Sequence, residues 1–425
     1  MITGVLIGAG QRGMEVYAAY ALQSPMQFKI VAVAEPDEIR RREMQQRHGI
    51  SDEMAFCTWE ELLSKNKMAD CAMVCTQDKM HTQPVMAALR KGYHVLCEKP
   101  MSPSAAECIA MEKTAQECGR TLTVCHVLRY SPFYTRLKKL LDDKIIGELV
   151  SLQHIECVGY WHQAHSFVRG NWRSSSETSP MILAKACHDM DLLAWLVGAP
   201  CKEVSSYGSL KHFKKENAPQ GSTPRCFDGC KVTHTCPYYC GKIYLEDEKW
   251  YSPVIRKVVA LDGTREAVAA ALKTGPYGRC VYHCDNDVVD HQVVNLQFAN
   301  DVTASFTMCA FTYEGSRIMN LMGTRGQIKA DMEKNTIEVF DFLTGNQDVI
   351  TIETGVGGHS GSDEAFVRGF LRTVETNGAY ALSSASQSVQ SHLIALAAEQ
   401  SRVTGQSVCM DAFIKGLKSE SHEKL

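Results

Sequence analysis

The sequence lacks an apolar run long enough to cross a membrane, which takes about 20 consecutive apolar residues in a helix. It also lacks an excess of charge of one sign, because 45 Lys and Arg against 48 Asp and Glu leave a net charge of −3 at pH 7. We therefore expect no nucleic-acid partner and no membrane partner. The first apolar run begins within a few residues of Met1, so we expect no signal peptide and a cytoplasmic protein.

Internal repeats and low-complexity segments are also missing from the sequence. Disulfide-rich secreted scaffolds are short and carry an export signal, so we expect the 18 cysteines to be mostly reduced thiols. With 425 residues, of which 45% are hydrophobic and 22% charged, the chain is too long for one ordinary core. It suits a globular protein of two domains.

The N-terminal stretch has the order strand, glycine turn, helix. The apolar run Thr3 to Ile7 leads directly into Gly-Ala-Gly-Gln-Arg-Gly, and a helical pattern follows from Met14. The first glycine permits a tight turn, the second lets the backbone approach a pyrophosphate, and the third lets the helix pack close to the strand. The pattern predicts a dinucleotide-binding turn, with an ordinary strand-to-helix turn as the alternative. The predicted cofactor-binding residues of this loop are Gly8, Gly10, Gln11, Arg12 and Gly13.

A second apolar run, 28–34, is followed by Glu35. Its distance from the glycine turn, about 20 residues, is the interval expected for a carboxylate that accepts hydrogen bonds from the adenosine ribose. Such a group repels a 2′-phosphate, so Glu35 is a predicted cofactor-binding residue that favours NAD over NADP. The neighbouring Arg40 and Arg41 leave NADP open as the alternative.

Further apolar runs at 71–75, 93–97 and 122–126 alternate with helical patterns. This alternation implies parallel crossovers and a doubly wound sheet. We predict an α/β fold in which residues 1–128 form a Rossmann domain. Its ligand-contacting loops should follow the strand ends at Thr76-Gln77-Asp78 and Glu98-Lys99-Pro100.

The pattern changes after the sixth strand, and residues 129–410 are predicted to form an α+β domain with a large, mostly antiparallel open sheet. Strands are expected at 148–158, 290–298, 302–311, 316–323 and 326–331. One long helix is expected at 180–197. The polar, Cys-bearing stretch at about 211–289 is expected to be an insertion.

The glycine turn, Thr76 to His81 and above all Glu98-Lys99-Pro100 at a strand end resemble the glucose-fructose oxidoreductase, inositol dehydrogenase and rhizopine catabolism (Gfo/Idh/MocA) family. The resemblance covers nearly the whole chain. It implies NAD as cofactor, a small-molecule carbohydrate substrate and a homodimer or homotetramer. It also implies that Lys99 takes part in catalysis and touches nicotinamide and substrate. The cofactor-binding residues that it adds are Thr76, His81, Glu98, Lys99, Trp172 and Arg173. For His81, packing of the cofactor loop is the alternative to a contact with the nicotinamide half.

Two further catalytic candidates lie in the predicted helix 180–197. His188 matches the family's catalytic histidine, although a histidine hydrogen-bonded in the core is its alternative. Family members commonly carry an aspartate four residues earlier, where this chain has Ala184. Lys185 beside it is the second candidate, and pairing with Asp189 is the alternative reading for this lysine.

The stretch 160–169 is dense in aromatic, imidazole and guanidinium groups. Aromatic faces stack on sugar rings and polar tips hydrogen-bond hydroxyl groups, so the stretch predicts a carbohydrate-binding loop. An ordinary loop packed on the second sheet is the alternative. The predicted substrate-binding residues are Tyr160, His162, His165 and Arg169, together with His359 in a later glycine-rich loop.

Four cysteines of the insertion, Cys226, Cys230, Cys236 and Cys240, are paired at short spacing. Thiolates in a polar segment too small for its own core suit a structural zinc ion, whose binding would replace hydrophobic burial. Free buried thiols are the alternative.

We predict an NAD-dependent enzyme that oxidises or reduces a carbohydrate or polyol hydroxyl by hydride transfer, with C3 of a hexose or glycoside as the expected position. The alternative enzyme is a glycoside hydrolase with tightly bound, recycled NAD. There, oxidation at C3 acidifies the C2 proton, the C1 substituent is eliminated, water adds and the ketone is reduced again. A non-enzymatic NAD-sensing protein is the third possibility.

Overall fold

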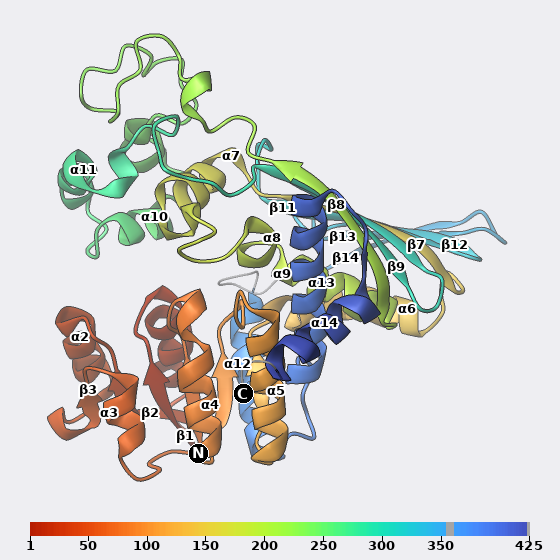
Figure 1. Ribbon diagram of the computed structural model, residues 1–425, viewed down its shortest axis with the longest axis horizontal. Helices are drawn as coiled ribbons and strands as arrows, with labels where there is room; N and C mark the ends of the chain where they lie inside the picture. The colour runs from red at the N-terminus through yellow and green to blue at the C-terminus, as the bar shows by residue number, and fades with distance from the viewer. Residues whose placement is uncertain (354–360, 423–425) are drawn as a thin grey trace.

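The computed structural model describes residues 1–353 and 361–422 of the chain (Figure 1). Its first sheet has six strands, all parallel, in the order β3-β2-β1-β4-β5-β6. This is the strand order of the Rossmann fold, in which ligands bind at the carboxyl ends of the strands. The predicted doubly wound sheet is confirmed. Its strands are β1 (Ile2–Ile7), β2 (Phe28–Ala34), β3 (Ala55–Phe56), β4 (Cys71–Val74), β5 (His94–Cys97) and β6 (Leu122–Val124).

Helices connect these strands and cover both faces of the sheet. Local capping defines several of their ends: the Thr58 hydroxyl accepts a hydrogen bond from the Glu61 N–H at 3.2 Å, as the sequence of this segment predicts. The helical segments are Gly13–Ala18 continuing into α1 (Ala19–Gln23), α2 (Glu38–His48), α3 (Trp59–Ser64), α4 (Thr82–Arg90) and α5 (Ala105–Glu117).

The second sheet has nine strands in the order β14-β13-β12-β11-β7-β10-β9-β8-β15. Its paired strands are antiparallel apart from β7 and β10, so the predicted mostly antiparallel sheet is confirmed. Buried and exposed residues alternate along β9, as in a sheet with one covered face. The strands are β7 (Leu149–Cys157), β8 (Cys201–Ser209), β9 (His291–Phe298), β10 (Thr303–Cys309), β11 (Ser316–Gly323), β12 (Gly326–Asp331), β13 (Thr336–Asp341), β14 (Gln347–Thr351) and β15 (Val408–Cys409).

The expected long helix at 180–197 is in fact two helices. α8 (Met181–Ala184) ends before α9 (Cys187–Val197) begins, and a turn at Lys185 separates the two helices. The last carbonyl groups of a helix have no partner within the helix. The carbonyl of Ala184 is therefore free to accept a hydrogen bond from another part of the chain.

The chain returns to the first sheet near its C-terminus. Phe366, Val367, Phe370 and Leu371 of α12 (Ser362–Glu375) share one apolar core with β1 and β2. The following helix, α13 (Ala385–Thr404), packs on α5 and α9 and so contacts both domains. These helices and α14 (Met410–His422) are blue in Figure 1, where α12 lies beside the first domain. The two domains therefore share a continuous apolar interior.

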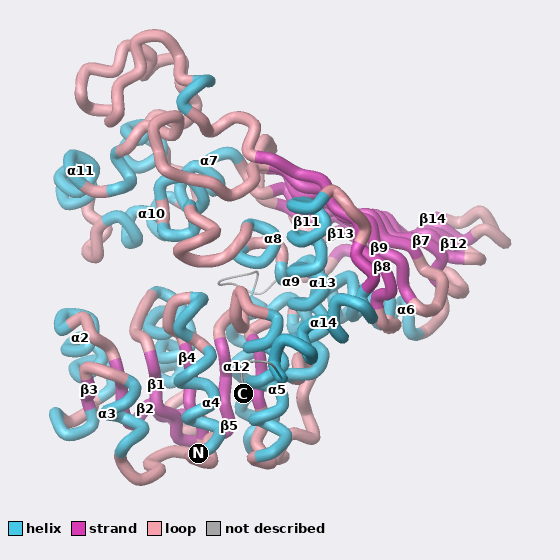
Figure 2. The backbone as a smooth tube through the Cα atoms, in the orientation of Figure 1, coloured by secondary structure: helices cyan, strands magenta, loops and turns pink. Residues whose placement is uncertain are grey.

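The insertion consists of short helices and long loops, seen as the largely pink region beyond β8 in Figure 2. Two apolar clusters hold it together, one around Tyr244 and Leu272 and the other around Phe213 and Tyr282. The expectation that this segment lacks a core of its own is wrong. Its helices are α10 (Ser252–Val259) and α11 (Arg265–Thr274); α6 (Pro132–Asp142) and α7 (Tyr160–His162) precede it in the second domain.

Across the described ranges, 1–353 and 361–422, we find no helix with the length and hydropathy that a membrane span requires.

Candidate active site

The glycine turn after β1 has the geometry of a pyrophosphate cradle. Gly8 has φ +91°, and a Cβ there would lie 2.7 Å from the Cys75 carbonyl oxygen. A Cβ on Gly13 would lie 2.3 Å from the carbonyl oxygen of Gly8, so the helix approaches the strand as closely as its backbone allows. A Cβ on Gly10 would meet no atom within 4 Å, which leaves space beside the helix start for a bound phosphate group. These residues fit a dinucleotide.

Glu35 lies at the carboxyl end of β2, next to this turn. Its side chain accepts hydrogen bonds from the backbone N–H of Ala9 at 2.6 Å and of Asp37 at 3.0 Å. The carboxylate is thus held at the edge of the glycine turn, where the adenosine ribose is bound in this fold. The guanidinium of Arg41 donates hydrogen bonds to the backbone carbonyls of Glu35 and Pro36.

Arg12 of the glycine turn, which is half-buried, forms an ion pair with the buried Glu98 after β5. Arg12 Nε lies 2.7 Å from Glu98, and its guanidinium is also 3.0 Å from Asp363 of α12. Glu98 further accepts hydrogen bonds from the Tyr17 hydroxyl and the Cys125 thiol. Burial alone would raise the pKa of Glu98, but the Arg12 charge and these hydrogen bonds lower it to about 2. The pair therefore connects the glycine turn to β5 and to α12.

The loop after β4 is tied to the second domain. The His81 ring lies between two backbone carbonyls, with Nδ1 2.8 Å from Pro100 O and Nε2 3.0 Å from Thr76 O. These contacts support loop packing as the role of His81. Asp78, which the sequence analysis did not select, is buried and accepts hydrogen bonds from Ser179 Oγ at 2.6 Å and Trp172 Nε1 at 3.4 Å. Trp172, a predicted cofactor contact, therefore contacts the loop after β4.

Arg173, a predicted cofactor contact, pairs with two carboxylates of the second domain. Its guanidinium pairs with Asp285 of the insertion at 3.0 Å and with Glu177 at 3.1 Å. These contacts engage its side chain with carboxylates of the second domain, and they raise its pKa. In this structure Arg173 fastens the insertion to the turn that carries Trp172.

Lys99 follows β5 at the carboxyl edge of the first sheet, and its side chain reaches the second domain. Its Nζ donates a hydrogen bond to the Ala184 carbonyl oxygen at 3.0 Å. The break between α8 and α9 exposes this carbonyl, so the helix interruption is part of the site. His188, in the first turn of α9, is only 6% exposed, and its ring meets that of His126 edge-on at 5.8 Å.

A row of buried histidines lies behind His188. His126 follows β6, is fully buried, and contacts the ring of His392 at 5.5 Å. Burial lowers the pKa of His126 to about 4, with the Lys99 charge among the smaller contributions. His126 was missed because it was treated as a strand end. Its place after the last parallel strand, where this fold binds ligands, was the available signal.

Lys185 pairs with Glu156 of β7, not with Asp189. The Nζ of Lys185 lies 2.9 Å from Glu156 Oε1, while Asp189 bonds His154 at 2.7 Å and Arg317 at 2.8 Å. Arg317 also lies 3.0 Å from Glu156, so Arg317 pairs with both carboxylates and Glu156 pairs with both Lys185 and Arg317. His154 and Glu156 are at alternate, buried positions of β7. Polar residues at the inward positions of a strand could have indicated this network of ion pairs from the sequence.

The predicted substrate-binding side chains of 160–169 differ in burial: His162 is half-buried, whereas His165 and Arg169 are buried. The ring of His162 stacks on Trp161 at 5.2 Å and meets Phe167 at 5.7 Å. Burial, followed by the charges of Lys185, His165 and Lys99, keeps the pKa of His162 well below its ordinary value. His165 instead bonds the Tyr244 hydroxyl at 3.0 Å and stacks on Tyr277.

Arg169 is also buried, with 1% of its surface exposed. It donates to the carbonyls of Arg279 at 2.7 Å and Tyr238 at 2.6 Å. His165 and Arg169 thus support the insertion instead of lining a sugar site. The physical reason is that the insertion folds over this part of the stretch and buries it.

Two predicted groups remain. His359 lies outside the described residues. Within the residues that the structure describes, no three His, Cys, Asp or Glu side chains gather as a metal site would require, so the predicted zinc ligands Cys226, Cys230, Cys236 and Cys240 do not form one. Cys226 and Cys240 are instead part of the apolar cluster around Tyr244. Hydrophobic burial supplies the folding drive that zinc was expected to supply.

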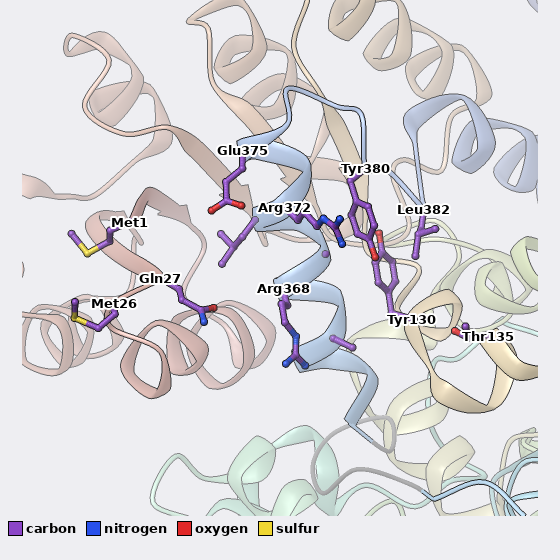
Figure 3. A pocket seen from close by; sticks show the side chains of 13 residues that line it. Met1, Met26, Gln27, Tyr130, Thr135, Arg368, Arg372, Glu375, Tyr380 and Leu382 are labelled. Atoms are coloured by element: carbon purple, nitrogen blue, oxygen red, sulfur yellow. The ribbon is translucent and has the colours of Figure 1, made fainter.

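A cavity of about 730 Å³ lies on the outer side of α12 (Figure 3). Arg368 and Arg372 of α12 line it together with Tyr130 and Tyr380, and Arg372 lies over the Tyr380 ring at 4.1 Å. The other described residues that line it lie in α12, at the N-terminus and before β2 (Met1, Met26 and Gln27), and in the segments of Thr135 and Leu382, and Lys99 is not among them.

Comparison with known proteins matches both domains. The family model described as "Oxidoreductase family, NAD-binding Rossmann fold" matches residues 2–126, and the model described as "Oxidoreductase family, C-terminal alpha/beta domain" matches residues 138–410. Both models are those of the Gfo/Idh/MocA oxidoreductases.

Individual relatives are distant. The Bacillus subtilis protein YteT is 24% identical over 321 residues, which are 72% of each chain. The 2,7-anhydro-N-acetylneuraminate hydratase of Escherichia coli is 27% identical over 50% of this chain and 54% of its own length. A solved structure of levoglucosan dehydrogenase with NADH and levoglucosan has the same fold, with a TM-score of 0.71, 17% identity and coverage of 96% of this chain and 99% of the other.

Proposed function

Because this chain belongs to the Gfo/Idh/MocA family of NAD-dependent oxidoreductases, we propose that it oxidises or reduces a hydroxyl-bearing carbon of a carbohydrate or polyol, with C3 of a hexose or glycoside as the reacting position. The observation that carries the proposal is the position of Lys99. Its Nζ crosses from the carboxyl edge of the Rossmann sheet to Ala184 O, 3.0 Å away, at the turn before His188. A substrate bound there would lie between the two domains.

The residues of the chain divide the work. The glycine turn and Glu35 would hold NAD, which supplies the redox chemistry by accepting or returning a hydride. Lys99, oriented by the Ala184 carbonyl, exchanges the proton of the reacting hydroxyl. His188, which is 6% exposed, lies in the first turn of α9, just after the turn at Lys185, and its burial limits the access of water.

Glycoside cleavage with recycled NAD is the second candidate, and two observations favour it. The aspartate common in the family is Ala184 here, and two nearby cations, Lys99 and Lys185, offer separate acid and base groups. A relative is named a hydratase, a word for addition of water without net redox change. In this reaction Lys99 takes the hydroxyl proton, and a second group takes the proton from the adjacent carbon.

The test is to denature the purified protein, quantify released NAD(H), and assay the native enzyme on aryl glycosides without added cofactor. Release of near-stoichiometric NAD with many turnovers of aglycone and no net NADH supports the recycled-cofactor enzyme. An empty protein that forms one NADH per sugar oxidised, only when NAD is supplied, supports the dehydrogenase. Absence of hydride transfer and of glycoside cleavage across sugars and polyols would overturn both.

A further inference from the structure

Two large aromatic side chains near the candidate site are exposed to solvent. Trp250, just before α10, is 77% exposed, and Tyr313, between β10 and β11, is 71% exposed. Single exposed apolar residues are ordinary, but these two belong to one cluster. We name this cluster the aromatic platform; it comprises Tyr160, Trp161, Trp250, Tyr251 and Tyr313.

The exposed rings contact less exposed ones: Trp161 and Tyr251 are buried, and Tyr160 is half-buried. Trp250 meets Trp161 edge-on at 6.0 Å and Tyr251 edge-on at 5.7 Å. Trp161 and Tyr251 stack at 3.6 Å, and Tyr313 stacks over Tyr160 at 6.5 Å. The platform is therefore a rigid assembly whose outer faces remain open.

The backbone that carries the two exposed rings is also held in place. Just before Trp250, the Lys249 N–H donates to Ser252 Oγ at 3.0 Å. The guanidinium of Arg256 donates to the Asp247 carbonyl at 3.0 Å and so holds the preceding residues. On the other side, the Tyr160 N–H donates to the Thr312 carbonyl at 2.9 Å. Preorganised rings lose little conformational freedom on binding a ligand.

The platform is continuous with the candidate active site. Trp161 stacks on the adjacent His162 ring at 5.2 Å, His162 meets Phe167 at 5.7 Å, and Phe167 meets Trp172 at 6.2 Å. The indole of Trp172 in turn donates to Asp78 on the loop after β4, so a row of ring contacts joins the platform to the loops at the carboxyl edge of the first sheet. The flat, apolar face of a pyranose ring can stack on an exposed aromatic ring. Aromatic side chains commonly line the binding sites of small ligands.

We propose that the aromatic platform is a second carbohydrate subsite, which binds the sugar ring attached to the one that reacts. The natural substrate is then an oligosaccharide or a sugar-substituted glycoside instead of a monosaccharide. This inference rests on the proposed function, since it extends the substrate of the same site.

The test measures binding by isothermal titration calorimetry in the presence of NAD, with glucose and galactose against cellobiose, maltose, lactose and melibiose. In the wild-type protein at least one disaccharide is expected to bind roughly tenfold more tightly than its component monosaccharides. In Trp250→Ala and in Tyr313→Ala this ratio should fall to about one. Phe342→Ala, which removes a ring of 62% exposure from a distant turn, should leave the ratio unchanged.

Disaccharides that bind no more tightly than monosaccharides in the wild-type protein would overturn the inference, as would an equal loss of the ratio in Phe342→Ala. Failure of the proposed function has a different signature. In that case no sugar would undergo hydride transfer or cleavage, while the dependence of disaccharide binding on Trp250 would persist.

Discussion

Lys99 illustrates how a single residue obtains its role from both domains. The first domain supplies its backbone after β5, and the second supplies the carbonyl of Ala184 that orients its Nζ. The Glu-Lys-Pro motif at a strand end, through its resemblance to the family, pointed to this residue from the sequence. The orienting carbonyl was not identifiable, because it depends on a helix break that periodicity did not reveal.

Replacing Lys99 by Met removes the nitrogen and keeps the length of the side chain. We expect kcat to fall roughly 100- to 10,000-fold, the range typical of a lost acid–base group, with NAD affinity nearly unchanged. Steady-state kinetics and NAD titration measure the two effects. Lys113→Met on α5, where the side chain is 72% exposed, is the control. A Lys99→Met enzyme with more than about a tenth of the wild-type kcat would contradict the assignment.

His392 couples stability to pH. Its Nδ1 donates to Ser388 O at 2.7 Å and its Nε2 accepts from the Met101 N–H at 2.9 Å, so the folded ring is neutral, and burial lowers its pKa to about 3. The unfolded chain gains a proton near pH 6.5. Between pH 6.5 and about 3 the unfolded state therefore binds more protons, and stability falls as pH falls.

Urea denaturation between pH 7 and pH 5 measures this loss. His392→Gln preserves one donor and one acceptor and removes the titration. We expect it to reduce the slope of unfolding free energy against pH by up to about 1.4 kcal/mol per pH unit. The exposed His234→Gln should leave the slope unchanged. An unchanged slope in His392→Gln would show that this ring is not a source of the acid sensitivity.

At the scale of the element, the strand, turn and helix at the N-terminus show the closest agreement between pattern and structure. The steric demand on Gly13 is local, because it comes from the Gly8 carbonyl, whereas that on Gly8 comes from the Cys75 carbonyl of the neighbouring strand segment; the spacing of the glycines nevertheless predicted both positions. The 160–169 stretch shows the opposite. Its composition suited both a sugar-binding loop and an interior segment, and the fold of the insertion decided that His162 is half-buried while Arg169 is buried.

Two alanine substitutions separate cofactor space from backbone packing in the glycine turn. Gly10→Ala adds a Cβ that meets no protein atom within 4 Å, so stability should change by less than about 0.5 kcal/mol while NAD affinity falls roughly tenfold or more. Gly13→Ala places a Cβ 2.3 Å from the Gly8 carbonyl and should cost about 1–3 kcal/mol of stability. Thermal unfolding without NAD and NAD titration distinguish the two. Equal NAD affinity in Gly10→Ala and the wild type would mean that the cofactor does not approach this backbone.

At the scale of the whole molecule, the two domains are joined by more than the linker near residue 128. α12 belongs to the second half of the chain but contributes Phe370, fully buried, to the core of the first sheet. Asp363 at the start of the same helix pairs with Arg12 of the glycine turn. We therefore expect the two domains to unfold together.

Phe370→Ala tests this coupling. Removing a buried phenylalanine ring should lower the unfolding free energy by about 3–5 kcal/mol. Because α12 packs on the helix that follows the glycine turn, NAD affinity should fall as well. Calorimetry should show one transition shifted to lower temperature, whereas Phe342→Ala, at an exposed turn, should shift it little. Two separate transitions in either protein would contradict the shared core.

By itself, the sequence determined the Rossmann order, the open antiparallel sheet, the glycine turn and Lys99 at a strand end. These features depend on short-range periodicity and on backbone sterics, which neighbouring residues set. Only the tertiary structure decided the partner of Lys185, the orienting role of Ala184, the burial of Arg169 and the packing of the insertion cysteines without a metal site in the described residues. Each of these joins segments far apart in the chain, where burial and charge pairing depend on how the elements pack.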